Sequence, residues 1–321
     1  MANQFTALVS DPLAAEGVAL LEHSGLFVRV DVKTGLDAAS LHAILPEYDA
    51  LLIRSMTKVK AETLSHAKRL RVIGRAGAGV DNVDVPACTA KKVLVMNTPG
   101  GNNNAVAELA LGMLFAIARK LCEANASTKA GKWEKSKFMG GELQGRTLGV
   151  VGLGAIGAIV SRKAAALGMH VLACDPAATD RRARELGATL VDFETLLHKS
   201  DAVSVHVPLA DATRHMFDEA AFAKMKKGAW FVDCARGDIA VEADLVAALK
   251  SGQIGYAAID VFAQEPTPTD NPVLALPNVL CTPHIGASPR EAQDNVGIQI
   301  AQQVIRYLRD GVIENAVNTI A

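Results

Sequence analysis

Short apolar runs rich in Val, Ile and Leu alternate along almost the whole chain with longer segments in which apolar residues return at helical spacing. The short runs are nearly continuous, so both faces of the strands that they predict are expected to be buried. A parallel sheet with helices on both faces buries its strands in this way. The pattern therefore predicts an α/β fold built from doubly wound parallel sheets.

The apolar runs of the first hundred residues predict strands at 5–10, 27–32, 49–55, 70–77 and 93–99. Helices are expected between these strands, at about 12–23, 37–45, 61–67 and 83–91. A long apolar helix is then expected from about 103 to 121, with Asn102 or Asn103 as its N-cap. The polar stretch 130–146 is interpreted as an irregular loop.

Strands return at 147–153, 170–175, 202–208, 229–235, 255–261 and 279–283. A helix is expected at 155–168, directly after the first of them. The last helix is predicted from about Pro289 to Leu308, with Ser288 as N-cap and Pro289 in the first helical turn.

Two segments rich in Gly and Pro, at 97–101 and 282–289, interrupt the alternation and mark where the chain is expected to cross between domains. The sequence thus predicts one domain from residues 1–100 and 286–321, with a second domain, 101–285, inserted into it. The last helix would then return to pack on the first domain. Two crossings favour a hinge, and the cleft between the domains is the expected place for a small-molecule site.

Composition excludes several classes of function. Lys and Arg together number 33 against 34 Asp and Glu, so no excess of positive charge predicts binding to nucleic acid or to an anionic membrane. The most membrane-like run, 112–118, is far too short to span a bilayer, and the N-terminus lacks the pattern of a signal peptide. Five scattered cysteines are interpreted as small buried apolar residues of a cytoplasmic protein, with no metal site.

The segment 147–157, TLGVVGLGAIG, places Gly152, Gly154 and Gly157 after a predicted strand and at the start of a helix. Asp175 closes the next strand about 20 residues further on, the spacing of a Rossmann-type dinucleotide site. The helix N-terminus offers free N–H groups to a pyrophosphate. A carboxylate at Asp175 favours NAD over NADP, because it would repel a 2′-phosphate. A second glycine-rich segment, 74–82, has a different order and is interpreted as a loop that offers N–H groups to a substrate anion.

Arg236, Glu265 and His284 each follow a predicted strand and are therefore expected at the carboxyl edge of the same sheet. Reduction of a 2-oxo acid by NADH needs a cation for the carboxylate and an acid that protonates the carbonyl oxygen. A guanidinium can hold a carboxylate by two hydrogen bonds. An isolated histidine is more often structural, but a carboxylate next to an imidazole fixes its tautomer and favours its protonated form. The three residues thus form a candidate catalytic set.

The motifs GLGAIG, HVPL, CARGDI, DVFAQEP and TPHIGAS occur here in the order found in the D-isomer-specific 2-hydroxyacid dehydrogenases, and the sequence resembles this family along nearly its whole length. Within the family, the segments IRSMTKV, GRAGAGVDNVDV, VMNTPGGNNNAVAE and KFMGGELQGRTLG are most similar to the D-3-phosphoglycerate dehydrogenases. The resemblance implies reversible, NAD-linked oxidation of 3-phosphoglycerate to 3-phosphohydroxypyruvate, a step of serine biosynthesis.

The resemblance also implies roles for single residues, with Arg236, Glu265 and His284 as the catalytic ones. The implied cofactor contacts are Gly152, Gly154, Ile156, Gly157, Asp175, Pro208, Ala235 and Asp260, the last of them meeting the nicotinamide amide. The implied substrate contacts are Arg54, Ser55, Ala78 and Gly79. The family habit is a homodimer or homotetramer that associates through the inserted domain. The sequence ends at Ala321, and we expect it to lack the C-terminal regulatory domain of longer relatives.

Five residues depart from the family pattern: Ala155 stands where the family often has Arg, Asn103 and Ala105 replace the usual small hydroxyl residues, and Asp238 and Ala240 are unusual after the catalytic arginine. Two other functions therefore stay open at this stage. One is a relative that acts on a different 2-hydroxy acid, such as a glyoxylate/hydroxypyruvate reductase. The other is an NAD-sensing corepressor that shares the fold and binds the cofactor without turnover.

Overall fold

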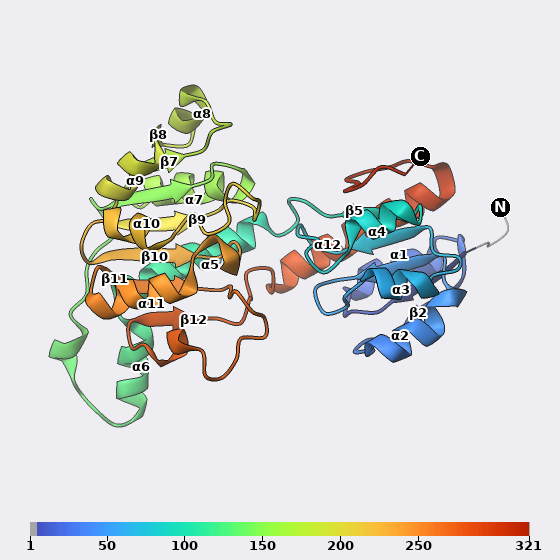
Figure 1. Ribbon diagram of the computed structural model, residues 1–321, viewed down its shortest axis with the longest axis horizontal. Helices are drawn as coiled ribbons and strands as arrows, with labels where there is room; N and C mark the ends of the chain where they lie inside the picture. Colours follow the sequence, from blue (N-terminus) through green and yellow to red (C-terminus); the bar gives the residue numbers. More distant parts are fainter. Residues whose placement is uncertain (1–4, 321) are drawn as a thin grey trace. The chain divides into compact units, whose positions relative to one another are not determined.

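The computed structural model describes residues 5–320 and divides the chain into two compact units (Figure 1). Unit 1 contains residues 5–102 and 287–320, and unit 2 contains Asn103–Gly286. Each unit is a parallel sheet with helices on both faces, so the predicted fold class is confirmed. Among the described residues, no helix combines the length and the apolar character that a membrane span requires.

Unit 1 is built on a five-stranded sheet in the order β2-β1-β3-β4-β5. Its strands are β1 (Phe5–Val9), β2 (Phe27–Val32), β3 (Ala50–Ile53), β4 (Val72–Arg75) and β5 (Leu94–Asn97). Its helices are α1 (Ala15–His23), α2 (Ala38–Ile44), the 3-10 helix η1 (Leu45–Glu47), α3 (Ala61–His66), α4 (Val85–Ala90) and α12 (Arg290–Asp310).

The two faces of the unit 1 sheet are covered by different parts of the chain. On one face α1 and α12 pack together, and Ile300 and Val304 of α12 lie fully buried among sheet residues. On the other face Leu41 of α2, Leu64 of α3 and Cys88 of α4 form a second apolar cluster. The last helix therefore packs in unit 1, next to strands almost 200 or more residues earlier in the sequence.

Unit 2 is built on a seven-stranded sheet in the order β12-β11-β10-β9-β6-β7-β8. Its strands are β6 (Thr147–Val151), β7 (His170–Cys174), β8 (Ala188–Leu190), β9 (Ala202–Val205), β10 (Ala229–Asp233), β11 (Ile254–Ile259) and β12 (Val279–Cys281). Its helices are α5 (Asn103–Ala118), α6 (Leu121–Lys129), η2 (Lys135–Phe138), α7 (Ala155–Ala166), α8 (Asp180–Glu185), α9 (Phe193–Lys199), α10 (Glu219–Lys224), η3 (Gly237–Ile239), α11 (Glu242–Ser251) and η4 (Pro272–Ala275).

Two apolar layers cover the unit 2 sheet. The layer under α5 and α7 contains Leu114 and Val160. The layer under α9, α10 and α11 contains Phe217, Phe222 and Phe231, whose rings contact one another at centroid distances of 5.0 to 6.0 Å. Because every strand pairing in this sheet is parallel, the carboxyl ends of all strands lie along one edge.

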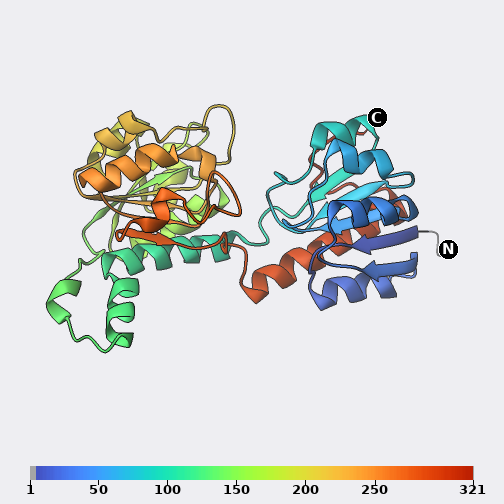
Figure 2. The ribbon, with the colours of Figure 1, turned by 60° about the horizontal axis from the view of Figure 1, so that its bottom comes forward.

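The predicted long helix 103–121 is wrong at its C-terminal end. The helix stops at Ala118, and Lys120 adopts a left-handed backbone conformation with φ 51° before α6 begins. The carbonyl oxygen of Ala118 accepts a hydrogen bond from the N–H of Gly141 at 2.9 Å, so a distant segment satisfies it. In Figures 1 and 2 the green segment with α6 extends away from the rest of unit 2.

Two other expectations need correction. The stretch 130–146 is not wholly irregular, because it contains the short helix η2, in which Lys137 forms an ion pair with the N-cap residue Glu134 at 2.5 Å. Ser288 is not the N-cap of the last helix. Pro289 occupies that position with ψ 143°, an extended value, so the first helical residue is Arg290 and no side chain caps the helix.

The five cysteines are free thiols, but they are not uniformly buried. Cys88 and Cys234 are buried, and Cys174 and Cys281 are partly buried. Cys122 is exposed, contrary to the expectation, because it lies on α6, where no residue is buried.

Candidate active site

The glycine loop follows β6 and leads into α7. Gly152 has φ 92°, and a Cβ at this position would lie 2.7 Å from the carbonyl oxygen of His206, so only glycine fits without strain. Gly154 occupies the N-cap position of α7, and Ile156 and Gly157 lie in the first turn. The loop stands where β6 has β7 on one side and β9 on the other, the point in an open α/β sheet where nucleotides bind.

Asp175 follows β7 directly and contacts the same loop. Its Oδ2 accepts a hydrogen bond from the N–H of Leu153 at 2.7 Å, and its Oδ1 accepts one from Ala177 at 2.8 Å. The nearby Arg181 and Arg182 both form ion pairs with Glu185, at 3.2 and 3.6 Å. The carboxylate therefore holds the glycine loop, a role in addition to the choice of NAD over NADP that the sequence predicts for it.

Pro208 and Ala235 also lie on segments that leave the carboxyl edge of this sheet, after β9 and β10. His206, next to Pro208, is a poor candidate for a proton donor, because burial lowers the pKa of its imidazole to about 4. Within residues 5–320, no group of three or more His, Cys, Asp or Glu side chains is arranged to hold a metal ion.

Glu265 and His284 contact each other on the loops that follow β11 and β12. Oε2 of Glu265 lies 2.7 Å from Nδ1 of His284, and Oε1 accepts a hydrogen bond from the N–H of Phe262 at 3.1 Å. Burial raises the pKa of Glu265, but hydrogen bonds from His284 and Phe262 and the positive charges of His284 and Arg236 outweigh it, so the pKa is lowered overall. Glu265 is thus an anion that engages Nδ1 of His284 and not Nε2.

Arg236 lies shortly after β10, and β10 is the neighbour of β11 in the sheet. A Cβ at the following residue, Gly237, would lie 2.0 Å from the carbonyl carbon of Phe262, so the backbones of the two loops are in direct contact. The Nη1 atom of Arg236 donates to the carbonyl oxygen of Ala235 at 2.6 Å. The loops that carry Arg236 and Glu265 are therefore held side by side. Asp238, the residue that is unusual for the family, forms an ion pair with Arg214.

Asp260 has a different set of contacts from the one that the sequence suggests. Its side chain is buried, its Oδ1 accepts hydrogen bonds from the Thr282 hydroxyl at 2.5 Å and the Ile285 N–H at 2.8 Å, and its Oδ2 accepts one from Gly286 at 2.8 Å. These bonds enclose His284 on both sides. Asp260 thus holds the histidine loop, while its contact with the nicotinamide amide stays a prediction.

Asp233, at the end of β10, is a buried carboxyl group that the sequence analysis missed. Its Oδ1 accepts a hydrogen bond from the N–H of Ala235 at 2.7 Å. Burial raises its pKa to about 7, and Asp260 adds to the increase, while the Ala235 hydrogen bond and Arg236 oppose it. The available signal was an acidic residue at the end of an apolar strand, directly before the candidate catalytic arginine.

The predicted substrate residues lie together in unit 1, at the carboxyl edge of its sheet. Arg54 and Ser55 follow β3, and Ala78 and Gly79 follow β4, its neighbour. The carbonyl oxygen of Ala78 accepts a hydrogen bond from Nδ2 of Asn97 at 2.5 Å, which ties this loop to the end of β5. The structure thus brings the four substrate candidates together within unit 1 and the catalytic and cofactor candidates together within unit 2.

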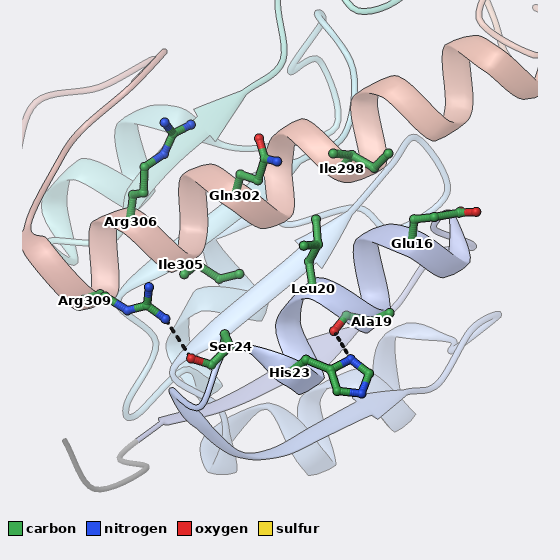
Figure 3. A pocket seen from close by; sticks show the side chains of 10 residues that line it. All are labelled: Glu16, Ala19, Leu20, His23, Ser24, Ile298, Gln302, Ile305, Arg306 and Arg309. Atoms are coloured by element: carbon green, nitrogen blue, oxygen red, sulfur yellow. Dashed lines mark hydrogen bonds between the residues drawn. The ribbon is translucent and has the colours of Figure 1, made fainter.

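A groove of about 860 Å³ lies elsewhere in unit 1, between α1 and α12. Figure 3 shows apolar Leu20 and Ile305 on its walls and Arg309 at one end, where the guanidinium donates to the carbonyl oxygen of Ser24 at 2.7 Å. It contains none of the residues assigned above. We therefore place the candidate site at the sheet edges and not in this groove.

Comparison with known proteins agrees with this geometry. Residues 111–286 match the family described as D-isomer specific 2-hydroxyacid dehydrogenase, NAD binding domain. A D-3-phosphoglycerate dehydrogenase of Archaeoglobus fulgidus is 47% identical over 311 residues, which cover 97% of this chain and 59% of that protein. The chain thus spans little more than half the length of such relatives.

Solved structures give the same result. The TT0316 protein from Thermus thermophilus aligns with a TM-score of 0.89 and 32% identity over 98% of this chain and 100% of its own. A D-lactate dehydrogenase from Aquifex aeolicus, solved with NAD and lactic acid, aligns with a TM-score of 0.85 and 25% identity over 98% and 100%. The chain therefore belongs to the D-isomer-specific 2-hydroxyacid dehydrogenases and carries their NAD-binding domain.

Proposed function

We propose that this protein is an NAD-dependent dehydrogenase that interconverts 3-phosphoglycerate and 3-phosphohydroxypyruvate, a step of serine biosynthesis. The observation that carries the chemistry is the 2.7 Å pair of Glu265 and His284, because the loop with Glu265 also contacts the loop that bears Arg236. The choice of substrate is supported by relatives of 43–47% identity that are named D-3-phosphoglycerate dehydrogenases. Unit 2 is the cofactor domain in this proposal, and unit 1 is the substrate domain.

The residues around the glycine loop fit NAD. The N-terminus of α7 presents backbone N–H groups suited to a pyrophosphate, Gly152 permits the tight turn before it, and Gly154 lets the backbone approach the pyrophosphate. Asp175 would accept hydrogen bonds from the adenosine ribose hydroxyls. Ile156, Pro208, Ala235 and Asp260 complete the proposed set of contacts. NAD, when bound, supplies the acceptor or donor of the hydride.

The side chains of this protein would handle the proton and the charges. In the oxidation of a 2-hydroxy acid, Arg236 binds the carboxylate, and Nε2 of His284 takes the proton of the hydroxyl group as the hydride leaves the same carbon. Glu265 holds the ring through Nδ1 and balances the charge of the imidazolium that forms. In the reverse reaction His284 returns the proton to the carbonyl oxygen. Arg54, Ser55, Ala78 and Gly79 are the proposed ligands of the phosphate group.

The proposed partner in assembly is a second copy of this chain. The segment with α6 and η2 exposes large apolar side chains, among them Trp133 at 87% and Met139 at 80%. Exposed apolar residues gathered on one segment are typical of an interface between proteins. We propose a homodimer, alone or paired into a tetramer, and a cytoplasmic location, which the five free thiols support.

A parallel assay of substrates tests the function. NADH oxidation by the purified protein is measured with 3-phosphohydroxypyruvate, hydroxypyruvate, glyoxylate and pyruvate, and the first of these with NADPH as well. We expect the highest kcat/KM for 3-phosphohydroxypyruvate with NADH. A preference for glyoxylate or hydroxypyruvate would assign the protein to another 2-hydroxy acid. Tight NADH binding without turnover of any substrate would favour an NAD-sensing corepressor instead.

A further inference from the structure

The sheet of unit 1 has its own reversal of strand order. From β1 the chain passes to β2 on one side and then returns to β3 on the other side of β1. In open α/β sheets, ligands bind at the carboxyl ends of the two strands where the order reverses. In unit 1 these ends carry Asp11, shortly after β1, and Arg54, directly after β3. An acidic and a basic residue therefore meet at the expected ligand position of this unit.

Asp11 is buried and only 2% exposed, so its carboxylate does not face solvent. Its Oδ2 accepts a hydrogen bond from the N–H of Arg54 at 2.6 Å, and its Oδ1 accepts one from the Thr57 hydroxyl at 2.7 Å. The N–H of Thr57 lies 3.1 Å from both oxygens. Asp11 thus holds the N–H groups at both ends of the turn 54–57.

Asn82 holds the carbonyl groups of the same two residues. Its Nδ2 donates to the carbonyl oxygen of Arg54 at 2.7 Å and to that of Thr57 at 2.6 Å. The Asn82 backbone also accepts a hydrogen bond from the N–H of Val59 at 2.8 Å. Because Asn82 ends the glycine-rich segment 74–82, it links the two segments that carry the proposed phosphate ligands.

We propose that Asp11 and Asn82 are positioning residues, which hold the turn 54–57 from its N–H side and from its C=O side and so orient Arg54 for the phosphate group of the substrate. This inference rests on the function proposed above. A preformed turn binds an anion more tightly than a turn that must become ordered during binding. Both residues act through Arg54, and the catalytic groups of unit 2 are not involved.

The charge of Asp11 supports the same role. Burial lowers the pKa of the Arg54 guanidinium, and the carboxylate of Asp11 opposes this effect. The buried carboxylate therefore stabilises the charge of a half-buried cation next to it. Loss of Asp11 is expected to weaken the binding of a phosphorylated substrate and to leave the rate of hydride transfer in the bound complex unchanged.

The test compares Asp11→Asn with Asp49→Asn in the full-length protein. Asp49 is a matched control, because it is also a buried carboxylate, 5% exposed, and accepts hydrogen bonds from Thr6 at 2.9 and 3.0 Å. It precedes β3, whereas Arg54 follows it, so Asp49 lies at the opposite edge of the same sheet. Asp11→Asn should raise KM for 3-phosphohydroxypyruvate by roughly tenfold or more, the effect of losing one strong hydrogen bond.

In Asp11→Asn, kcat and the KM values for NADH and for hydroxypyruvate should stay within about threefold of the wild type, a change of less than 1 kcal/mol. Asp49→Asn should lower stability without this shift in KM. Equal KM changes in the two variants, or a fall in kcat alone, would overturn the inference while the proposed function stands. A wild-type protein inactive on 3-phosphohydroxypyruvate would overturn both.

If Asp11→Asn does not fold, Thr57→Val carries the test, because it removes only the hydroxyl that donates to Asp11. It should raise KM for the phosphorylated substrate by roughly threefold to tenfold at unchanged kcat. A KM equal to that of the wild type would refute the role of this turn.

Discussion

Asp233 is the last residue of β10, Asp260 directly follows the neighbouring strand β11, and both residues are buried. Their oxygens accept hydrogen bonds from backbone N–H groups of the loops that carry the proposed catalytic residues. Asp233 contacts the segment before Arg236, and Asp260 contacts the segment around His284. Single buried carboxyl groups thus determine where the reactive side chains lie.

The raised pKa of Asp233 predicts a pH-dependent stability. Its pKa is about 7 in the folded protein against a usual 3.8, so its contribution to stability is full below about pH 3.8 and is lost as the pH rises through 7. Asp233→Asn keeps an oxygen for the Ala235 N–H and cannot ionise. The variant should therefore gain stability relative to the wild type between pH 5 and 8, by up to a few kcal/mol.

Urea unfolding followed by circular dichroism at pH 5, 6, 7 and 8 measures this difference. A difference between the two proteins that does not change with pH would show that Asp233 is already ionised throughout this range.

His284 is the residue on which turnover should depend most. His284→Asn removes the proton donor and acceptor but keeps a side chain that tolerates the left-handed backbone found here, φ 52°. We expect kcat to fall by about 10²–10⁴-fold, the usual contribution of a positioned acid or base, while NADH binding stays unchanged. Steady-state kinetics and fluorescence titration with NADH measure the two quantities, and unchanged kcat would place the donor elsewhere.

At the scale of elements, the sequence predicted most strands because their apolar runs are continuous and bounded by turns. The ends of β6, β10, β11 and β12 could be located in this way, and the residues just beyond them formed the candidate site. The exception is β8, a three-residue edge strand in which the polar Thr189 separates Ala188 from Leu190, so it forms no continuous apolar run of the kind that marked the equally short β12.

The elements predicted wrongly depend on contacts from distant segments. Nothing in the local pattern of 103–121 indicates a stop at Ala118, because the hydrogen bond to its carbonyl oxygen comes from Gly141, more than one helix further along the chain. The contacts of Asp11, Asp233 and Asp260 were missed for a similar reason. Each of these contacts joins residues that lie close together because of the order of the strands in the sheet. The spacing of apolar residues along the sequence does not indicate that order.

Asp175 joins two elements, β7 and the glycine loop, and this changes what its removal should do. Asp175→Ala loses the proposed ribose contact and also the acceptor for the Leu153 N–H. We expect KM for NADH to rise by roughly tenfold or more, with a smaller change in KM for NADPH. The preference for NADH over NADPH should therefore become smaller, mainly because NADH binds more weakly. Kinetics with both cofactors give the answer, and a wild-type preference for NADPH would contradict the assignment of Asp175.

At the scale of the whole molecule, the chain crosses from unit 2 to unit 1 between Gly286 and Ala287. Gly286 donates a hydrogen bond to Asp260, so the last residue of unit 2 belongs to the loop that holds His284. The crossing segment therefore begins directly after the loop that carries the proposed proton donor.

The exposed apolar residues of the segment with α6 and η2 predict that copies of the chain associate in solution. The double variant Trp133→Ser/Met139→Ser should lower the mass measured by light scattering toward that of one chain, because these side chains are 87% and 80% exposed within a single chain. A wild-type protein that is already a monomer would remove the basis for this prediction, and an unchanged mass in the variant would move the interface elsewhere.

The left-handed backbone at His284 also bears on how this protein can evolve. Histidine in this conformation costs on the order of 1 kcal/mol, which glycine does not incur, and its exposed ion pair with Glu265 returns less than about 1 kcal/mol. His284→Gly should therefore melt at the same temperature as the wild type or higher. Selection for heat resistance alone would therefore not retain the proposed proton donor, so its retention depends on selection for turnover.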